Sequence, residues 1–417
     1  GLGIAVVVVF VFTLMSAQAL MIAPSPKTIY VPDNYSTIQQ AVDSASPGDT
    51  IIVRDGTYIE NVYIDKPYLT IESENGSTNC IVEAANSSNP VIEVTASYVS
   101  ITGFTVRKGS IGIYLNHTSY CNISKNNCSN NGNGILLWYS NNSNITNNIG
   151  SKNSQSTICL SVSNDNVISS NICKDSFTNI GLSYSNNNKI ENNNCSNTNI
   201  QGRWPYYGIY LSHSNNNLIT NNKYFDNIYG IYLFESSYNK IIGNEIFKNT
   251  EGLSTRWKSM SNEISRNTFF DNSIGLYLHD VCYMVCPIRN NNIIYLNSFI
   301  NNTDNARSLA SENIWRSTEP MLYTYNGKTY KSYLGNYWDD YIGSDTDGDG
   351  IGDYPYVIYS ENQDNYPLMK PIENYKIIEK WSFAIITDLH VGYGIPDFGT
   401  DGWDDTLTGN PALDNYY

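Results

Sequence analysis

One asparagine returns every 22 or 23 residues through the middle of the chain, and this period constrains the fold more than any other feature. Its positions are Asn126, Asn148, Asn171, Asn193, Asn222, Asn244, Asn267 and Asn297, spaced by 22, 23, 22, 29, 22, 23 and 30 residues. A mostly apolar column follows two residues later, at Cys128, Gly150, Cys173, Cys195, Tyr224, Ile246, Phe269 and Phe299. A fixed period of this length is typical of stacked repeats.

Two short apolar segments also recur in each repeat. The first is a Gly-apolar-x-apolar segment, as in Gly112–Leu115 and Gly230–Leu233. The second carries an isoleucine three residues before each asparagine. Alternation along a strand places Ile113 inside and Tyr114 outside. These features predict an all-β fold, a parallel β-helix with three faces and about 22 residues per coil. We expect the asparagine to take a left-handed turn conformation and its amide to bond the neighbouring coils.

The two ends of the repeat region predict caps. The β-helix is predicted over 28–317, and residues 28–76 form its entry cap, with a short helix over 35–45 capped by Ser36. A capped end shields the core and the edge strands of a solenoid. Residues 318–372 are predicted as the C-terminal cap. The longer intervals indicate insertions at 199–207 and 281–290, which we expect to project from one face.

The first 19 residues predict export. An apolar run ends in Ala17-Gln18-Ala19, which fits the cleavage site of a signal peptide; the alternative is an uncleaved membrane anchor. The 417 residues carry a net charge of −15, which makes nucleic acid an unfavourable partner. Several Asn-x-Ser/Thr sequons permit glycosylation, among them those at Asn75, Asn116, Asn144 and Asn301. We therefore expect a secreted or cell-surface protein that contacts a membrane only through such an anchor.

An acidic loop in the C-terminal cap predicts a structural Ca²⁺ site. Its carboxylates stand at positions 1, 3, 5 and 9 of a calcium-type loop, with a glycine at position 6: Asp345, Asp347, Asp349, Asp353 and Gly350. Position 12 is Tyr356, so a further ligand such as Asp339, Asp340 or Asp364 would have to complete the shell. The alternative is an acidic turn without an ion.

Outward aromatic side chains predict a glycan-binding surface. The candidates are Tyr114, Trp138, Tyr210, Tyr232, Phe234 and Tyr277. Aromatic faces along a sheet can stack on sugar rings, whereas the alternative is that they only stabilise the sheet.

Cys128, Cys173 and Cys195 share the apolar column, which favours small buried hydrophobic residues over a disulfide framework.

The cap and the repeats together resemble a known group. Ile38-Gln-Gln-Ala-Val42, Pro47-Gly-Asp-Thr-Ile-Ile-Val53, Gly56-Thr-Tyr58 and the asparagine repeats are similar to pectin-lyase-like right-handed β-helices. They resemble most the carbohydrate-binding and sugar-hydrolysis group that includes the periplasmic copper-binding NosD family. This resemblance implies a right-handed solenoid. The segments 335–341, 345–353 and 364–368 are similar to the C-terminal part of exported archaeal members, which implies an archaeal, exported protein. Copper would need clustered Cys, Met or His residues, and the sequence offers only Cys282, Met284 and Cys286.

Residues 381–417 resemble the start of a calcineurin-like metallophosphoesterase. The segment Phe383-Ala-Ile-Ile-Thr-Asp-Leu-His390 is similar to the first motif of that family, in which the residues matching Asp388 and His390 bind the first of two metal ions. The later motifs are absent from this chain. Divalent transition metals would therefore be expected only with a complete domain.

Three functions remain open from the sequence. The first is an exported β-helix that binds polysaccharide or envelope glycans. The second is a metallophosphoesterase whose β-helix is a targeting module. The third is a polysaccharide lyase or hydrolase acting on the helix face, for which the sequence identifies no catalytic residues; a glycosidase would need a placed carboxylate pair.

Overall fold

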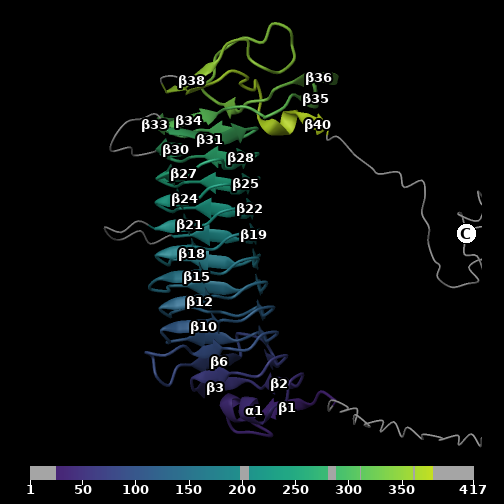
Figure 1. The fold of residues 1–417 in the computed structure, drawn as a ribbon, viewed down its shortest axis with the longest axis vertical. Coiled ribbons are helices and arrows are strands. Elements are labelled where there is room, and N and C mark those ends of the chain that lie inside the picture. The colour runs from purple at the N-terminus through teal and green to yellow at the C-terminus, as the bar shows by residue number, and fades with distance from the viewer. Residues whose placement is uncertain (1–24, 198–205, 280–287, 310, 360–361, 379–417) are drawn as a thin grey trace, which may run out of the picture.

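The computed structural model describes residues 25–197, 206–279, 288–309, 311–359 and 362–378. They form one elongated stack of coils, with the helix α1 (Ile38–Ser44) at one end and the C-terminal cap at the other (Figure 1). The predicted all-β parallel β-helix is confirmed, because all three long faces are sheets of parallel strands.

The strands of each face lie in chain order along the stack. Sheet A comprises β1 (Thr28–Val31), β2 (Thr50–Val53), β5 (Thr70–Ser73), β8 (Ser100–Thr102), β11 (Asn122–Ser124), β13 (Asn144–Thr146), β16 (Val167–Ser169), β19 (Lys189–Glu191), β22 (Leu218–Thr220), β25 (Lys240–Ile242), β28 (Glu263–Ser265), β31 (Ile288–Tyr295) and β34 (Ser311–Ile314). Sheet B comprises β3 (Gly56–Ile59), β6 (Cys80–Glu83) and β9 (Thr105–Arg107), then β14 (Ile149–Ser151), β17 (Ile172–Lys174), β20 (Asn194–Ser196), β23 (Lys223–Phe225), β26 (Glu245–Phe247), β29 (Thr268–Phe270), β32 (Ser298–Ile300) and β37 (Tyr337–Trp338). Sheet C comprises β4 (Val62–Ile64), β7 (Ile92–Val94), β10 (Ile111–Asn116), β12 (Asn133–Trp138), β15 (Ser156–Ser161), β18 (Thr178–Ser183), β21 (Tyr207–Ser212), β24 (Tyr229–Phe234), β27 (Glu251–Arg256), β30 (Ile274–His279) and β33 (Asp304–Leu309).

The core is a set of columns of identical or similar side chains. The apolar column predicted two residues after each asparagine lies in sheet B, where Cys173 pairs with Cys195 and Phe269 with Phe299. Its cysteines are free and buried, as the sequence indicated. The recurring glycine of sheet C is required by close approach, because a Cβ on Gly230 would lie 2.5 Å from the carbonyl oxygen of Gly252 in the next coil.

The asparagine column forms a buried hydrogen-bond ladder. Each backbone N–H donates to the Oδ1 of the asparagine one coil further on, over 2.8 to 3.1 Å, from Asn126 through Asn297 to Asn336. Each side-chain Nδ2 donates to a carbonyl of the preceding coil, as Asn244 does to Ile219 at 2.9 Å. The predicted bonding between coils is therefore confirmed.

The predicted left-handed conformation of these asparagines was wrong. The positive φ belongs to the residue before each one, for example Lys125 at 56°, Asn147 at 56° and Gly243 at 69°. The ladder asparagine follows the turn and points inward, which its hydrogen bonds require. The sequence period fixed the column but could not distinguish the two neighbouring positions.

Further polar ladders run parallel to the first. One joins Ser143, Asn166, Asn188, Asn217, Asn239, Asn262, Asn292, Asn313 and Asn362. Another joins Thr118, Ser140, Ser163, Ser185, Ser214, Ser236 and Ser259. A third has one part from Asn131 through Asn153 to Ser176 and another from Asn227 through Asn249 and Asn272 to Asn302. Because the turn N–H groups of these ladders are paired with side-chain oxygens, the polar turns can lie inside the stack at little cost.

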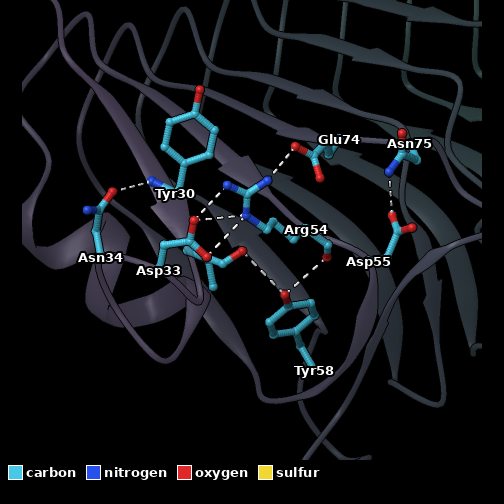
Figure 2. A network of polar contacts seen from close by, with 9 residues as sticks. Tyr30, Asp33, Asn34, Arg54, Asp55, Tyr58, Glu74 and Asn75 are labelled. Carbon is cyan, nitrogen blue, oxygen red and sulfur yellow. Dashed lines mark hydrogen bonds and ion pairs between the residues drawn. The ribbon is translucent and has the colours of Figure 1, made fainter.

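The N-terminal end is closed by α1 and by an exposed ion network. Thr37, and not the predicted Ser36, caps α1 by accepting from the Gln40 N–H at 3.1 Å. Figure 2 shows Arg54 donating to Asp33 at 2.6 Å and to Glu74 at 2.6 Å. The Arg54 guanidinium lowers the pKa of Asp33 through these contacts.

The C-terminal end continues the solenoid further than the sequence predicted. Strand β37 adds Trp338 to the apolar column, 4.4 Å from the ring of Phe299. Beyond it lie β35 (Met321–Tyr325), β36 (Lys328–Ser332), β38 (Tyr356–Tyr359), β39 (Asn362–Asp364), the 3₁₀ helix at Ile372–Asn374 and β40 (Lys376–Ile378). Among the described residues, no helix has the length and apolar character needed to span a membrane.

Candidate glycan-binding face and acidic loop

Four tyrosines gather on the outer face of sheet C, and we call Tyr207, Tyr210, Tyr229 and Tyr232 the tyrosine patch. The Tyr207 ring lies 5.0 Å from the Tyr210 ring and 5.2 Å from the Tyr229 ring, stacked on both. The Tyr232 ring meets that of Tyr229 edge-on at 4.9 Å. All four side chains are partly exposed.

The repeat Tyr-Gly-Ile-Tyr-Leu explains why the patch forms. In β21 and β24 the second and third residues are both buried, so the first and fourth side chains lie outside. The parallel register then places Tyr207 beside Tyr229 and Tyr210 beside Tyr232. Aromatic neighbours on one face of a sheet stabilise it, and they also make an apolar surface.

A charged pair borders the patch on the next strand, β27. The guanidinium of Arg256 lies 4.3 Å from the ring centroid of Tyr277 and 5.9 Å from that of Tyr232. Its Nη2 contacts Glu251 at 3.0 Å, and the Ser254 hydroxyl donates to the same carboxylate. Both charged side chains are more than four-fifths buried, so the cation is matched within the protein.

Three hydroxyls of the patch are kept neutral by burial. Burial raises the pKa of Tyr232 to about 12, and burial also raises the pKa values of Tyr207 and Tyr229. These three phenols therefore stay protonated at neutral pH, where each hydroxyl can donate and accept a hydrogen bond.

The structure brings together only part of the predicted aromatic set. Three of the predicted aromatics are neighbours: the Tyr210 ring contacts the Tyr232 ring, and the Arg256 guanidinium lies between the rings of Tyr232 and Tyr277. Phe234 lies at the far edge of the same face, 6.0 Å from the His213 ring. Tyr114 and Trp138 are on β10 and β12, separated from β21 by β15 and β18, and Trp138 meets Tyr139 edge-on.

Sequence reasoning missed Tyr207, Tyr229, Arg256 and Glu251. Alternation along the strand assigns the tyrosine after each isoleucine to the outer face. It does not assign the residue before each glycine to that face, because the glycine and the isoleucine are both buried. The available signal was the doublet itself, since Tyr207-Gly208 and Tyr229-Gly230 stand one repeat apart. Arg256 and Glu251 carried no such signal, because their importance depends on which strands lie beside them.

The acidic loop brings three of its four predicted carboxylates together. Oxygen atoms of Asp345, Asp347 and Asp349 lie within 4.8 Å of one another. Asp345 accepts from the N–H groups of Gly348 and Gly350, at 2.8 and 3.0 Å. Burial, and then the neighbouring carboxylates, raise the pKa of Asp349. Clustered hard oxygens of this kind fit Ca²⁺.

The remaining predicted ligands lie elsewhere. Asp353 accepts from Ser344 at 2.8 Å and from the Thr346 N–H at 3.1 Å. Asp339 and Asp340 both accept from the Asn305 amide, at 3.0 and 2.9 Å. Asp364 is buried at the end of the asparagine ladder. The expectation that Asp339, Asp340 or Asp364 completes the loop's ligand shell is therefore corrected.

Several predicted features lie outside the described residues. They are Asp388 and His390, residues 381–417 as a whole, the signal segment 1–19, and Cys282, Met284 and Cys286. The insertions are narrower than predicted where the structure describes them, since β21 begins at Tyr207 and β31 at Ile288. The phosphoesterase motif stays a prediction.

Copper does not fit the described side chains. The described cysteines are free thiols, and burial raises the pKa of Cys80 to about 12 and that of Cys128 further. Copper ions bind Cys, Met or His groups that converge. In the part of the chain that the structure describes, the acidic loop is the only group of three or more His, Cys, Asp or Glu side chains close enough to share an ion.

Comparisons with known proteins agree with the fold. The A-module of mannuronan C-5 epimerase AlgE6 from Azotobacter vinelandii has a TM-score of 0.50 at 12% identity, covering 66% of this chain and 94% of that chain. A structure of the periplasmic alginate epimerase AlgG has a TM-score of 0.41 at 15% identity, covering 69% of this chain and 84% of that chain. At these identities the likeness concerns the fold alone.

A curated relative and a family also match. A cell surface glycoprotein of Methanothermus fervidus is 34% identical over 118 residues, which are 28% of this chain and 19% of that relative. The chain thus covers about a fifth of that relative's length. Residues 42–228 and 156–343 match the family described as Periplasmic copper-binding protein (NosD), and since these two segments together cover more than half of the chain, it belongs to this family.

Proposed function

We propose that this chain acts outside the cytoplasm as a β-helix that binds a neutral polysaccharide through the tyrosine patch. The observation that carries the proposal is the cluster of four partly exposed tyrosines on the outer face of sheet C. Membership of a family named for a periplasmic protein, and the matched cell surface glycoprotein, support the location. The matched epimerase module is named for mannuronan, an acidic polysaccharide, so it agrees with a glycan ligand and leaves the neutral class to be argued from the charges of this chain.

The electrostatics of the face favour a neutral glycan over an acidic one. Arg256 is matched by Glu251, and Arg307 is matched by Asp304 at 2.5 Å. Because both arginines are already paired with carboxylates of the protein, neither offers a free positive charge to a uronate. The net charge of −15 adds repulsion of acidic polymers. Aromatic faces and neutral hydroxyls suit the apolar faces and hydroxyl groups of uncharged sugars.

Removing one ring from the patch should weaken glycan binding. Tyr232→Ala is expected to raise the dissociation constant at least about tenfold, because the ring contacts three neighbouring tyrosines and its loss opens the surface. The matched control is Tyr238→Ala, which removes a more exposed tyrosine from a turn of the same coil. Isothermal titration with neutral and uronate oligosaccharides checks both variants.

The same titration can overturn the proposal. Equal affinities for the two variants would remove the patch from the binding site. Tighter binding of uronates than of neutral sugars would contradict the electrostatic argument. Shortened products after incubation with a glycan panel would instead support the lyase or hydrolase function.

We further propose that the acidic loop binds Ca²⁺ weakly and stabilises the C-terminal cap. The nearby carbonyls already accept from tyrosines, since Tyr323 bonds Asp349 at 3.0 Å and Tyr330 bonds Gly348 at 2.9 Å. The three carboxylates and water would therefore supply the ligands. Few protein ligands give a dissociation constant on the order of 10⁻⁴ to 10⁻³ M, as in extracellular modules.

A pair of variants tests the calcium proposal. Asp347→Asn is expected to weaken Ca²⁺ binding about tenfold or more, because it removes one of the three clustered charges. Asp353→Asn is expected to change the affinity less than about threefold, since Asp353 bonds Ser344 and Thr346 instead. Calcium titration followed by thermal unfolding measures both. An unfolding temperature of the unsubstituted chain that does not respond to millimolar Ca²⁺ would contradict the proposal.

A further inference from the structure

The sequence contains ten Asn-x-Ser/Thr sequons, and the structure divides them into two classes. They begin at Asn34, Asn75, Asn86, Asn116, Asn122, Asn127, Asn141, Asn144, Asn194 and Asn301. None of the buried asparagines of the main ladder begins a sequon, because the residue two positions on belongs to the apolar column. A sequon asparagine can carry a glycan in the folded protein only if its amide faces solvent.

Four sequons have their hydroxyl buried inside the stack. The hydroxyl residues are Thr118, Ser129, Ser143 and Ser196, which follow Asn116, Asn127, Asn141 and Asn194. Their asparagines are half-buried, and three of them are already bonded: Asn116 donates to Glu93 at 3.0 Å, Asn127 accepts from the Ser129 hydroxyl at 2.5 Å, and Asn141 accepts from the Asn164 N–H at 2.7 Å. A glycan at these sites would compete with these hydrogen bonds.

The other six sequon asparagines are exposed, and two of them are neighbours. Asn122 and Asn144 pair directly in the register of sheet A, on β11 and β13, and both side chains face outward. Ser124 and Thr146 lie on the same face as their asparagines, because residues two apart on a strand do. Adjacent strands are separated by about 4.8 Å, which is far less than the width of a branched glycan.

We propose that the chain is N-glycosylated at its exposed sequons, and that Asn122 and Asn144 exclude each other, so that one molecule carries a glycan on only one of the two. The coils that bear the tyrosine patch are spared, since residues 197–300 contain no sequon although asparagine is frequent there. In later coils, valine, lysine, leucine or glutamate takes the column of Asn122 and Asn144, at Val167, Lys189, Leu218, Lys240 and Glu263. The glycans would thus lie on the N-terminal half and at Asn301, and the coils between them would stay bare.

Site-specific glycopeptide mass spectrometry tests this on the full chain secreted from a host that performs N-glycosylation. The expected result is modification at exposed sites such as Asn75, which lies on the surface beside Asp55 (Figure 2), and none at Asn127 or Asn141. The occupancies of Asn122 and Asn144 should sum to no more than one. Asn122→Gln should raise the occupancy of Asn144, whereas Thr146→Ala should abolish it and raise that of Asn122.

Three outcomes would overturn the proposal. One is modification of Asn127 or Asn141 at the level of Asn75, because burial would then not select the sites. Another is full occupancy of both Asn122 and Asn144. The third is an unmodified chain from a host that glycosylates a control protein in the same culture.

Discussion

Asn244→Ala is expected to lower the free energy of unfolding by about 3–5 kcal/mol, since it interrupts the main asparagine ladder at its centre. The Oδ1 of Asn244 accepts from both the N–H and the Nδ2 of Asn222, at 2.9 and 3.0 Å. Its Nδ2 donates to Ile219 and to Asn267, both at 2.9 Å. Alanine would leave the buried Asn222 N–H without its acceptor, which costs about 1–3 kcal/mol, and would remove one hydrogen bond each from the Asn222 Nδ2, the Ile219 carbonyl and the Asn267 Oδ1, each worth about 1 kcal/mol.

An exposed asparagine provides the matched control. Asn144→Ala, measured on the unglycosylated chain, should change the free energy of unfolding by less than about 0.5 kcal/mol, because this side chain faces solvent. Urea unfolding followed by circular dichroism compares the two variants. Similar losses for both would mean that the ladder contributes no more than a surface residue does.

Removing the charge of Asp364 is expected to abolish a pH dependence of stability worth about 3 kcal/mol. Asp364 ends the same ladder and is fully buried. Its Oδ2 accepts from the Asn336 N–H at 2.7 Å and from the Trp338 indole at 3.1 Å, while its Oδ1 accepts from the Tyr366 N–H at 2.9 Å. Burial raises the pKa of Asp364 to about 6 despite these donors.

The sign of the effect follows from which state holds the proton. Between pH 3.8 and about 6 the folded carboxyl keeps its proton while the unfolded one loses it. The contribution of Asp364 is therefore greatest below pH 3.8 and falls as the pH rises through the folded pKa. Asp364→Asn keeps an acceptor for Asn336 and Trp338 but does not titrate. The stability of the unsubstituted chain minus that of the variant should thus fall by about 3 kcal/mol from pH 3.5 to pH 7.

Urea unfolding at several pH values measures this difference, and groups common to both proteins cancel from it. A difference that rises with pH would show that the hydrogen-bond donors around Asp364 outweigh burial. Asp364→Ala is the harsher comparison, since it leaves the donors of Asn336, Trp338 and Tyr366 without an acceptor. It should destabilise the chain at every pH.

Much of the scaffold could be predicted because each coil of a solenoid carries the same residue types at the same spacing. The 22-residue spacing of the asparagines, the isoleucine before them and the apolar column after them each correspond to one position of a coil, and the structure stacks them in that register. The continuation of the β-helix beyond residue 317 also had a signal in the sequence, since Asn336-Tyr-Trp338 repeats the spacing of Asn297-Ser-Phe299. This repeat was missed because acidic and aromatic residues surround it.

The sequence by itself determined the fold class, the coil length, the buried column and the residues able to bond between coils, because each depends on local spacing alone. Tertiary structure alone decided which of two adjacent turn residues takes the left-handed conformation, and which aromatics meet. Arg256 reaches Tyr277 and Tyr232 only because parallel coils lie side by side. Likewise Asp364 ends a ladder whose previous member, Asn336, is 28 residues away. Such contacts depend on how the coils stack, which no spacing within one coil records.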